Sequence, residues 1–165
     1  MSNTTAPERV IKTPPRPKRS DDYVRKAAVE RILPEVIEWL EEEDWEETEE
    51  EREGVIKDLL EVIDISDGYA AAARLDDRGW YPSSSLVKIL DELGSCLHNA
   101  EKAAVEAWVR GYVVRVPFEE QQAVWHGARS GVVEKVLPKE AQCLVKFADG
   151  KSSLVNAECL SDVQA

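Results

Sequence analysis

One apolar stripe runs through the stretch from Ser83 to Arg110. Its members recur at alternating steps of four and three residues, and they are Leu86, Leu90, Leu93, Leu97, Ala100, Ala104 and Ala107. This spacing keeps one face of a helix apolar for about seven turns. Ser83 or Ser84 can cap the start, and Gly111 suits the left-handed position just past the end. We therefore predict one long helix, in which Gly94 is a local misfit that marks a close crossing or a split.

Shorter helical patterns precede this stretch. The spacing of apolar residues predicts a helix from about residue 20, which Pro34 ends or kinks, and a short second helix after it. Thr48 and Glu51 form a capping-box pattern, which predicts the start of a third helix. A fourth, alanine-rich helix follows and closes at Gly79. The helical part therefore contains about five helices.

The aromatic residues of this half have expected places. Tyr69 and Leu75 are expected to face inward from the fourth helix. Trp80 and Tyr81 lie at the corner before the long helix, where an aromatic pair usually plugs the core.

After Gly111 the hydrophobic period changes from helical to strand-like. We predict a strand over 112–116, ended by Pro117, and then several closely spaced short strands. Asp149-Gly150 is the strongest hairpin signal in the chain. In the strand before it, alternation predicts that Cys143, Val145 and Phe147 face inward.

The C-terminal residues resemble a known group of small domains. The residues that carry the resemblance are Trp125, Gly127, Gly131, Val132, Val133, Val136, Val145, Phe147, Asp149, Gly150, Val155 and Leu160. In this order they resemble the small SH3-like barrels of the KOW or Tudor type, over roughly 40 residues. The resemblance implies a barrel that binds proteins, modified peptides or nucleic acid and is rarely an enzyme. The helical half, especially DGYAAAARLDDRGW (67–80) followed by LVKILDEL (86–93), looks like small uncharacterised phage or prophage proteins.

These patterns together predict an α+β protein of 165 residues in three parts. Residues 1–19 form a flexible, basic, proline-rich arm, residues 20–111 an acidic helical domain, and residues 112–165 the SH3-like barrel. The 43% apolar content supports a buried core. No apolar run is long enough to span a membrane. The three cysteines lack CxxC spacing, which favours a reduced, cytoplasmic compartment.

Charged residues are distributed unevenly along the chain. The net charge is −12, but residues 35–53 alone carry twelve carboxylates against one cation, Arg52, a local net of −11. Carboxylates in a first helical turn complement the helix dipole, and an acidic face also keeps a protein soluble. The alternative is an interaction surface for a basic partner, with Trp39 or Trp45 as its apolar anchor. Imitation of a nucleic-acid backbone is a special case of this alternative.

Candidate chemistry is sparse. Cys96 and His98 are two residues apart, so on a helix they point in different directions and cannot share a metal ion. His126 could approach a cysteine of the barrel, but a cysteine at an inward position is usually inert packing. We therefore expect no catalytic residue, no metal ion and no cofactor.

The favoured function is a non-enzymatic protein-binding module that acts through its acidic surface on a basic partner. If the phage resemblance is correct, the module inhibits or modulates a host defence complex. The alternative is a nucleic-acid-associated accessory protein that uses the barrel and the basic arm. The candidate partner-binding residues are Glu41, Glu42, Glu43, Trp45, Glu46, Glu47, Trp125, His126 and Arg129.

Overall fold

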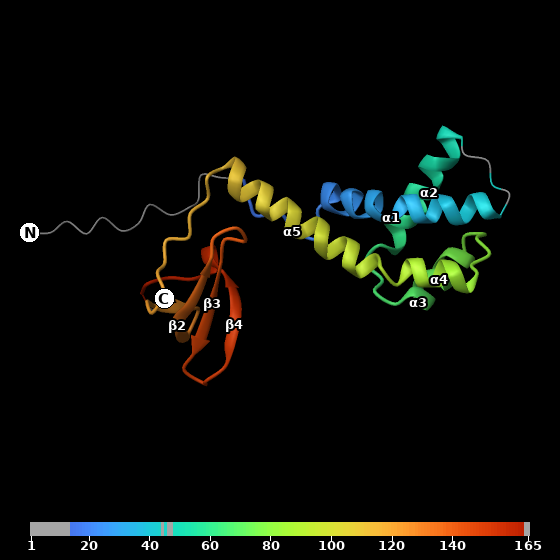
Figure 1. Ribbon diagram of the computed structural model, residues 1–165. Coiled ribbons are helices and arrows are strands. Elements are labelled where there is room, and N and C mark those ends of the chain that lie inside the picture. The colour runs from blue at the N-terminus through green and yellow to red at the C-terminus, as the bar shows by residue number, and fades with distance from the viewer. Residues whose placement is uncertain (1–13, 44, 46–47, 164–165) are drawn as a thin grey trace, which may run out of the picture. The chain divides into compact units, whose positions relative to one another are not determined.

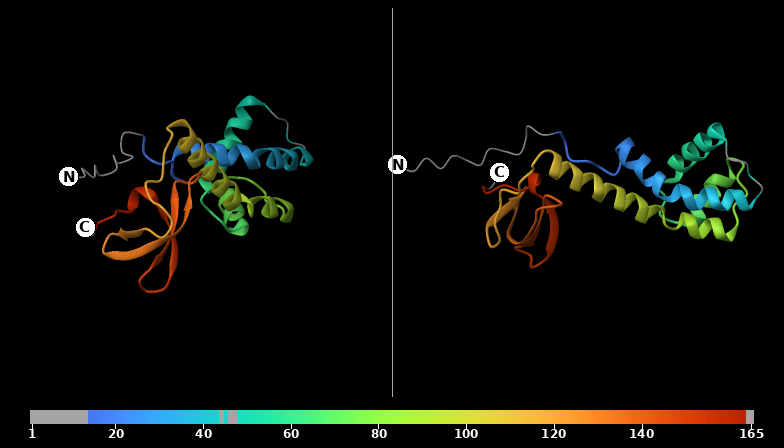
Figure 2. Two further views of the ribbon diagram at one scale, coloured as in Figure 1. Left: turned by 60° about the vertical axis from the view of Figure 1, so that its left-hand side comes forward. Right: turned by 45° about the horizontal axis from the view of Figure 1, so that its top comes forward.

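The computed structural model describes residues 14–43, 45 and 48–163 (Figures 1 and 2). These residues form two compact units. The first contains residues 17–104, and the second combines residues 14–16 with residues 105–163. Each unit is described by itself below.

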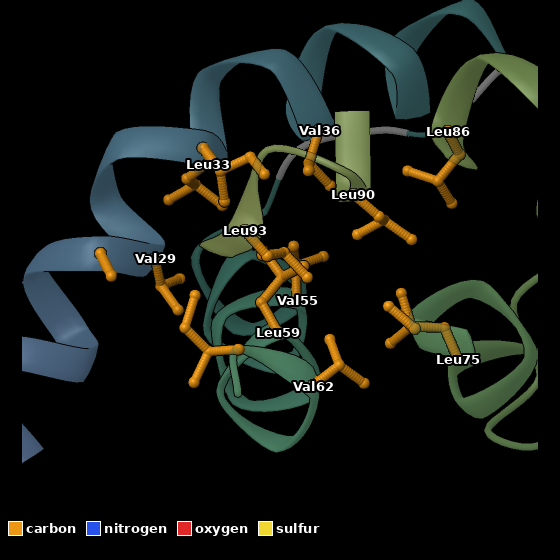
Figure 3. Packing of buried hydrophobic residues seen from close by; sticks show 14 of the residues in the cluster. Val29, Leu33, Val36, Val55, Leu59, Val62, Leu75, Leu86, Leu90 and Leu93 are labelled. Atoms are coloured by element: carbon orange, nitrogen blue, oxygen red, sulfur yellow. The ribbon is translucent and has the colours of Figure 1, made fainter. Parts of the chain in front are cut away.

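The first unit is a cluster of helices around one core. It contains α1 (Asp22–Glu42), α2 (Glu49–Val62), α3 (Gly68–Asp76), α4 (Ser84–Leu90) and the first part of α5 (Leu93–Gly111). Every one of these helices contributes to a single apolar cluster. Figure 3 shows its centre, where Leu33, Val36, Val55, Leu59, Val62, Leu75, Leu86 and Leu90 gather. Their burial is the main force that holds the unit together.

The prediction that Pro34 separates two helices is wrong, because α1 is one continuous helix from Asp22 to Glu42. Proline inside a helix removes one backbone hydrogen bond and costs about 3 kcal/mol. Pro34 itself is exposed, so its ring lies on the outer face. Leu33 before it and Val36 after it are both buried in the same core. Burying such side chains stabilises by about 1.5–3 kcal/mol each, which offsets the cost of the proline.

The predicted long helix over 83–110 is two helices, because the chain turns at Asp91 and Glu92 between α4 and α5. The Asp91 carboxylate explains the break, since its Oδ1 accepts a 2.7 Å hydrogen bond from the backbone N–H of Gly68, the first residue of α3. Aspartate competes well for such free amides and fits helix interiors poorly. The interruption comes three residues before Gly94, the position that the sequence had marked.

The second unit contains a four-stranded antiparallel sheet. Its strands are β1 (Ala123–His126), β2 (Arg129–Leu137), β3 (Gln142–Phe147) and β4 (Ser152–Asn156), and they pair in the order β1-β2-β3-β4. After β4 comes the short 3₁₀ helix η1 (Ala157–Cys159), and then Ser161 bridges to Trp125 of β1. A bulge interrupts the pairing of β2 with β3 between Val133 and Lys135.

The core of the second unit has two connected clusters. The sheet cluster contains Phe118, Val124, Val133, Cys143, Val145, Phe147, Val155, Ala157 and Leu160. A smaller cluster joins Val105 and Trp108 of α5 to Ala141 at the turn before β3. Val116 packs against both clusters. The predicted inward alternation of β3 is thereby confirmed, and so is the hairpin at Asp149-Gly150, where Gly150 has φ +81°.

The prediction of a strand over 112–116 is wrong, because this segment contains no strand. Gly111 is still helical, and Val113 instead adopts the left-handed conformation with φ +52°. The N–H of Val114 then donates to the carbonyl of Val109, which ends the helix in the manner of a Schellman motif.

The α+β class is confirmed: a helical part precedes a four-stranded antiparallel sheet. Across the described ranges of the chain, we find no helix that is both long and apolar enough to cross a membrane.

Candidate functional site

The C-terminal end of α1 is acidic. Glu41 and Glu42 occupy its last turn, Glu43 is its C-cap residue, and all three side chains are exposed. The last turn contains no basic residue. The C-terminal end of a helix carries partial negative charge from its free carbonyl groups, so carboxylates there are destabilising. We call Glu41, Glu42 and Glu43 the acidic end of α1.

The acidic residues at the start of α2 lie at the positive end of a helix dipole, opposite to those of α1. Glu49, Glu50 and Glu51 lie in its first turn, where negative charge complements the helix dipole. The N–H of Glu51 donates to the Thr48 hydroxyl at 3.2 Å, and that hydroxyl donates to the Glu51 carboxylate at 2.9 Å. The predicted helix start at Thr48 is therefore confirmed, although the Glu51 carboxylate accepts from the Thr48 hydroxyl in place of the backbone N–H of a full capping box. Helix stability accounts for these carboxylates but not for those of α1. Glu46 and Glu47 lie outside the described residues.

The two tryptophans proposed as anchors are engaged within the fold. Trp39 is only 6% exposed, stacks on Trp80 with ring centroids 6.3 Å apart, and donates from Nε1 to Ser83 Oγ at 2.9 Å. Trp45 is half-buried and packs against the helical core, and its backbone N–H donates to the Leu40 carbonyl. Both side chains thus hold α1 in place.

Tyr81 is an exposed aromatic side chain close in sequence to Trp80 and Ser83. The prediction that it plugs the core is wrong, because it is 88% exposed, and Tyr69 is also exposed instead of inward. Tyr81 lies between Trp80 and Ser83, both of which contact Trp39 near the end of α1. The position of Tyr81 just after Gly79 is the sequence signal that could have indicated this exposure. Gly79 has φ +92°, which ends the last turn after α3 and places the following residues in a loop.

A second group of candidate residues lies in the second unit. Arg129 pairs with Asp149 at 3.1 Å, and its guanidinium carbon lies 3.9 Å from the centroid of the Phe147 ring. The exposed His126 ring lies 6.3 Å from the same ring. Trp125 is half-buried, and its backbone exchanges hydrogen bonds with Ser161. Arg129 and His126 therefore flank Phe147, while Trp125 joins β1 to the segment around Ser161. The acidic end of α1 belongs to the other unit.

A shallow groove of about 470 Å³ lies beside this group. Val132, Lys146 and Phe147 are among its lining residues. It is wide open to solvent and has one charged side chain, so its shape indicates no particular ligand.

The cysteines and histidines do not form a chemical constellation. Cys143 is buried, and burial raises the pKa of its thiol, which therefore stays protonated at neutral pH. His98 is exposed, whereas Cys96 is half-buried. Within the ranges that the structure describes, we find no group of three His, Cys, Asp or Glu side chains that could hold a metal ion.

Arg16 is an anchoring residue that the sequence did not reveal. Its guanidinium donates to both carboxylate oxygens of Glu158, at 2.6 and 3.1 Å, and to the carbonyls of Glu140 and Ala141, each at 2.7 Å. It also lies 5.3 Å from the centre of the Trp108 ring, whose N–H donates to the Pro14 carbonyl. Residues 14–16 are therefore an integral part of the second unit.

Comparisons with protein-family models, curated proteins and solved structures give no match to this chain. The geometry described above is the remaining evidence on function. That geometry offers charged and aromatic surfaces, which suit recognition of another macromolecule.

Proposed function

We propose that this protein is a non-enzymatic binding protein whose acidic end of α1 recognises a basic protein surface. The observation that supports this most is the position of the three carboxylates at the negative end of a helix, where they lower stability. Exposed residues that cost stability are typical of functional sites. Tyr81 supplies an exposed aromatic side chain nearby, of the kind enriched at binding surfaces.

The distribution of charge supports a steering role for this surface. Residues 17–104 carry 24 acidic and 11 basic side chains, a net charge of −13, whereas residues 105–165 carry 8 and 7, a net charge of −1. Almost all of the negative electrostatic potential of the protein therefore originates in the helical unit. Such a field accelerates association with a positively charged partner and weakens as salt is added.

We further propose that the second unit is an SH3-like barrel. The support is the order of its elements, in which η1 follows β4 and returns the chain so that Ser161 bridges to β1. Such a return brings the end of the sheet toward its beginning.

For the target, we propose a host complex with a basic groove, which the acidic surface would occupy in competition with nucleic acid. Direct nucleic-acid binding by the second unit has less support, because its net charge is close to zero. Its Arg129 is also engaged by Asp149 and Phe147.

Two variants with the same loss of charge test this proposal. The α1 variant carries Glu41→Gln and Glu42→Gln, and the α2 variant carries Glu49→Gln and Glu50→Gln. Each tagged protein is used to capture partners from a lysate of the source organism at 50 and 300 mM salt. We expect one basic protein to be captured by the wild type and the α2 variant, to be depleted with the α1 variant, and to be lost at high salt. Equal capture by all three proteins would exclude the acidic end of α1 from the function.

A further inference from the structure

Strand β4 lies at the end of the sheet. Its one partner among the described strands is β3, because the order of the sheet is β1-β2-β3-β4 and the bridge from Ser161 goes to β1. An edge strand presents backbone N–H and C=O groups that can pair with another extended chain.

Two backbone hydrogen bonds at the ends of β4 determine which of its groups point to this edge. The N–H of Phe147 donates to the Lys151 carbonyl at 2.9 Å, and the N–H of Ala157 donates to the Ala141 carbonyl at 3.0 Å. In an antiparallel pair the hydrogen-bonded positions alternate. In the observed register Ser153 and Val155 therefore bond to β3. The N–H and C=O groups of Ser152 and Leu154 consequently point away from β3.

The side chains of this edge do not discourage pairing. Natural edge strands are usually protected by proline, lysine or a bulge. The sequence of β4 is SSLVN, which contains no proline and no charged residue, and its register with β3 is regular. Leu154 is 58% exposed and lies across from the half-buried Leu144. Next to them, Lys146 lies across from Ser152. A further strand in which apolar and small polar residues alternate could place an apolar side chain beside Leu154 and a small polar one beside Ser152.

We propose that the outer edge of β4 binds an extended, uncharged segment of a partner protein, which adds to the sheet as a further strand. A second copy of this chain is a poorer occupant for two reasons. The five residues of β4 are far fewer than the 20–30 residues a side of a stable interface, and each copy carries a net charge of −12. This interface lies in a different unit from the acidic end of α1 and stands independently of it.

The test uses the full-length protein and, as a probe, an acetylated and amidated pentapeptide of alternating threonine and valine. Amide hydrogen exchange is measured by NMR with and without the probe. In the free protein we expect the amides of Ser152 and Leu154 to exchange quickly, while those of Ser153 and Val155 are protected. Saturating probe should protect Ser152 and Leu154.

Two substitutions should weaken binding of the probe by about tenfold each. Ser152→Pro removes an outward N–H without removing a bond to β3, and Leu154→Lys adds a charge to the edge.

Two control variants accompany this test. Leu154→Thr keeps an uncharged strand former and should bind the probe with nearly unchanged affinity. The α1 variant should also bind it normally, which separates this proposal from the proposed function. Protection of Ser152 and Leu154 in the free protein, protection that rises with protein concentration alone, or equal probe binding by Ser152→Pro, Leu154→Lys and wild type would each overturn the proposal.

Discussion

Arg16 shows how much a single side chain contributes to the second unit. Its side chain is 12% exposed, and its donors meet one carboxylate and two carbonyl groups of residues more than 120 positions away in the chain. The planar guanidinium suits this arrangement, because it can approach a carboxylate with two parallel hydrogen bonds. Lysine has the same charge but not the same geometry.

We predict that Arg16→Lys destabilises the protein by about 1–3 kcal/mol, because several charge-assisted hydrogen bonds are lost or lengthened. Urea denaturation, followed by tryptophan fluorescence, measures the change. Arg19→Lys is the matched control, since Arg19 is half-exposed and makes one 3.3 Å contact with Glu101. It should change stability by less than about 0.5 kcal/mol. Equal effects of the two substitutions would show that the Arg16 contacts are weak.

The partner of Arg16 gives the pair a dependence on pH. Burial alone would raise the pKa of Glu158, but the hydrogen bond from Arg16, the backbone hydrogen bond and the charge of Arg16 together lower it. A carboxyl whose pKa is lower in the folded state stabilises the protein above its unfolded pKa, about 4.3, and loses this contribution as the pH falls through the lower folded value.

We therefore predict that the stability difference between the wild type and Glu158→Gln is constant above about pH 5.5 and shrinks below about pH 4.3. Denaturation curves of both proteins between pH 3 and pH 7 measure this difference, and using the difference cancels the titration of the other carboxylates. A difference that grows as the pH falls would contradict the assignment.

At the scale of elements, the two ends of the acidic run differ in energy although they look alike in sequence. Glu41 and Glu42 follow a helix that ends, whereas Glu49 and Glu50 begin one. The dipole of each helix therefore opposes the first pair and favours the second. Glu38 adds to the repulsion in α1, because it lies three and four residues before the pair.

We predict that the α1 variant is more stable than the α2 variant by about 1 kcal/mol, since glutamine and glutamate have similar helix propensities and both variants lose two charges. Thermal unfolding at low ionic strength measures the difference, and added salt should reduce it. If the α2 variant were the more stable of the two, helix dipoles would not govern these residues, and the claim of a stability cost would fail.

The elements also show where sequence patterns suffice. Alternation in β3, the hairpin at Gly150 and the helix start at Thr48 depend on local signals, and the sequence predicts each correctly because neighbours in the chain decide them. The predicted break at Pro34 and the predicted unbroken helix over 83–110 are wrong because distant contacts decide the local structure at Pro34 and at Asp91. The core around Pro34 keeps α1 continuous, and the bond from Gly68 ends α4 at Asp91.

The candidate site was predictable in part for the same reason. The density of negative charge is visible in the sequence, but its cost depends on where α1 ends and α2 begins. The burial of Trp39 follows from its tertiary contacts with Trp80 and Ser83 in the connection between α3 and α4, and the exposure of Tyr81 follows from its place in that same connection. The contacts of Arg16 join residues at opposite ends of the chain, so no local pattern indicates them.

At the scale of the whole molecule, the excess negative charge lies in the helical unit and not in the unit that contains the sheet. The helical unit carries a net charge of −13, whereas the other unit, with Arg16 included, carries eight acidic and eight basic side chains and a net charge of zero. We infer that the helical unit attracts a basic partner from a distance, and that the sheet unit contributes short-range pairing at β4. The two proposals make independent contributions, so loss of one leaves the other measurable.

The most direct test of the central claim is the dissociation constant of the captured basic partner for the α1 and α2 variants, measured by calorimetry at 100 mM salt. We predict that the α1 variant binds about tenfold or more weakly than the α2 variant, because its lost charges contact the partner. Equal dissociation constants would contradict the account, since the carboxylates would then act only through the total charge of the protein.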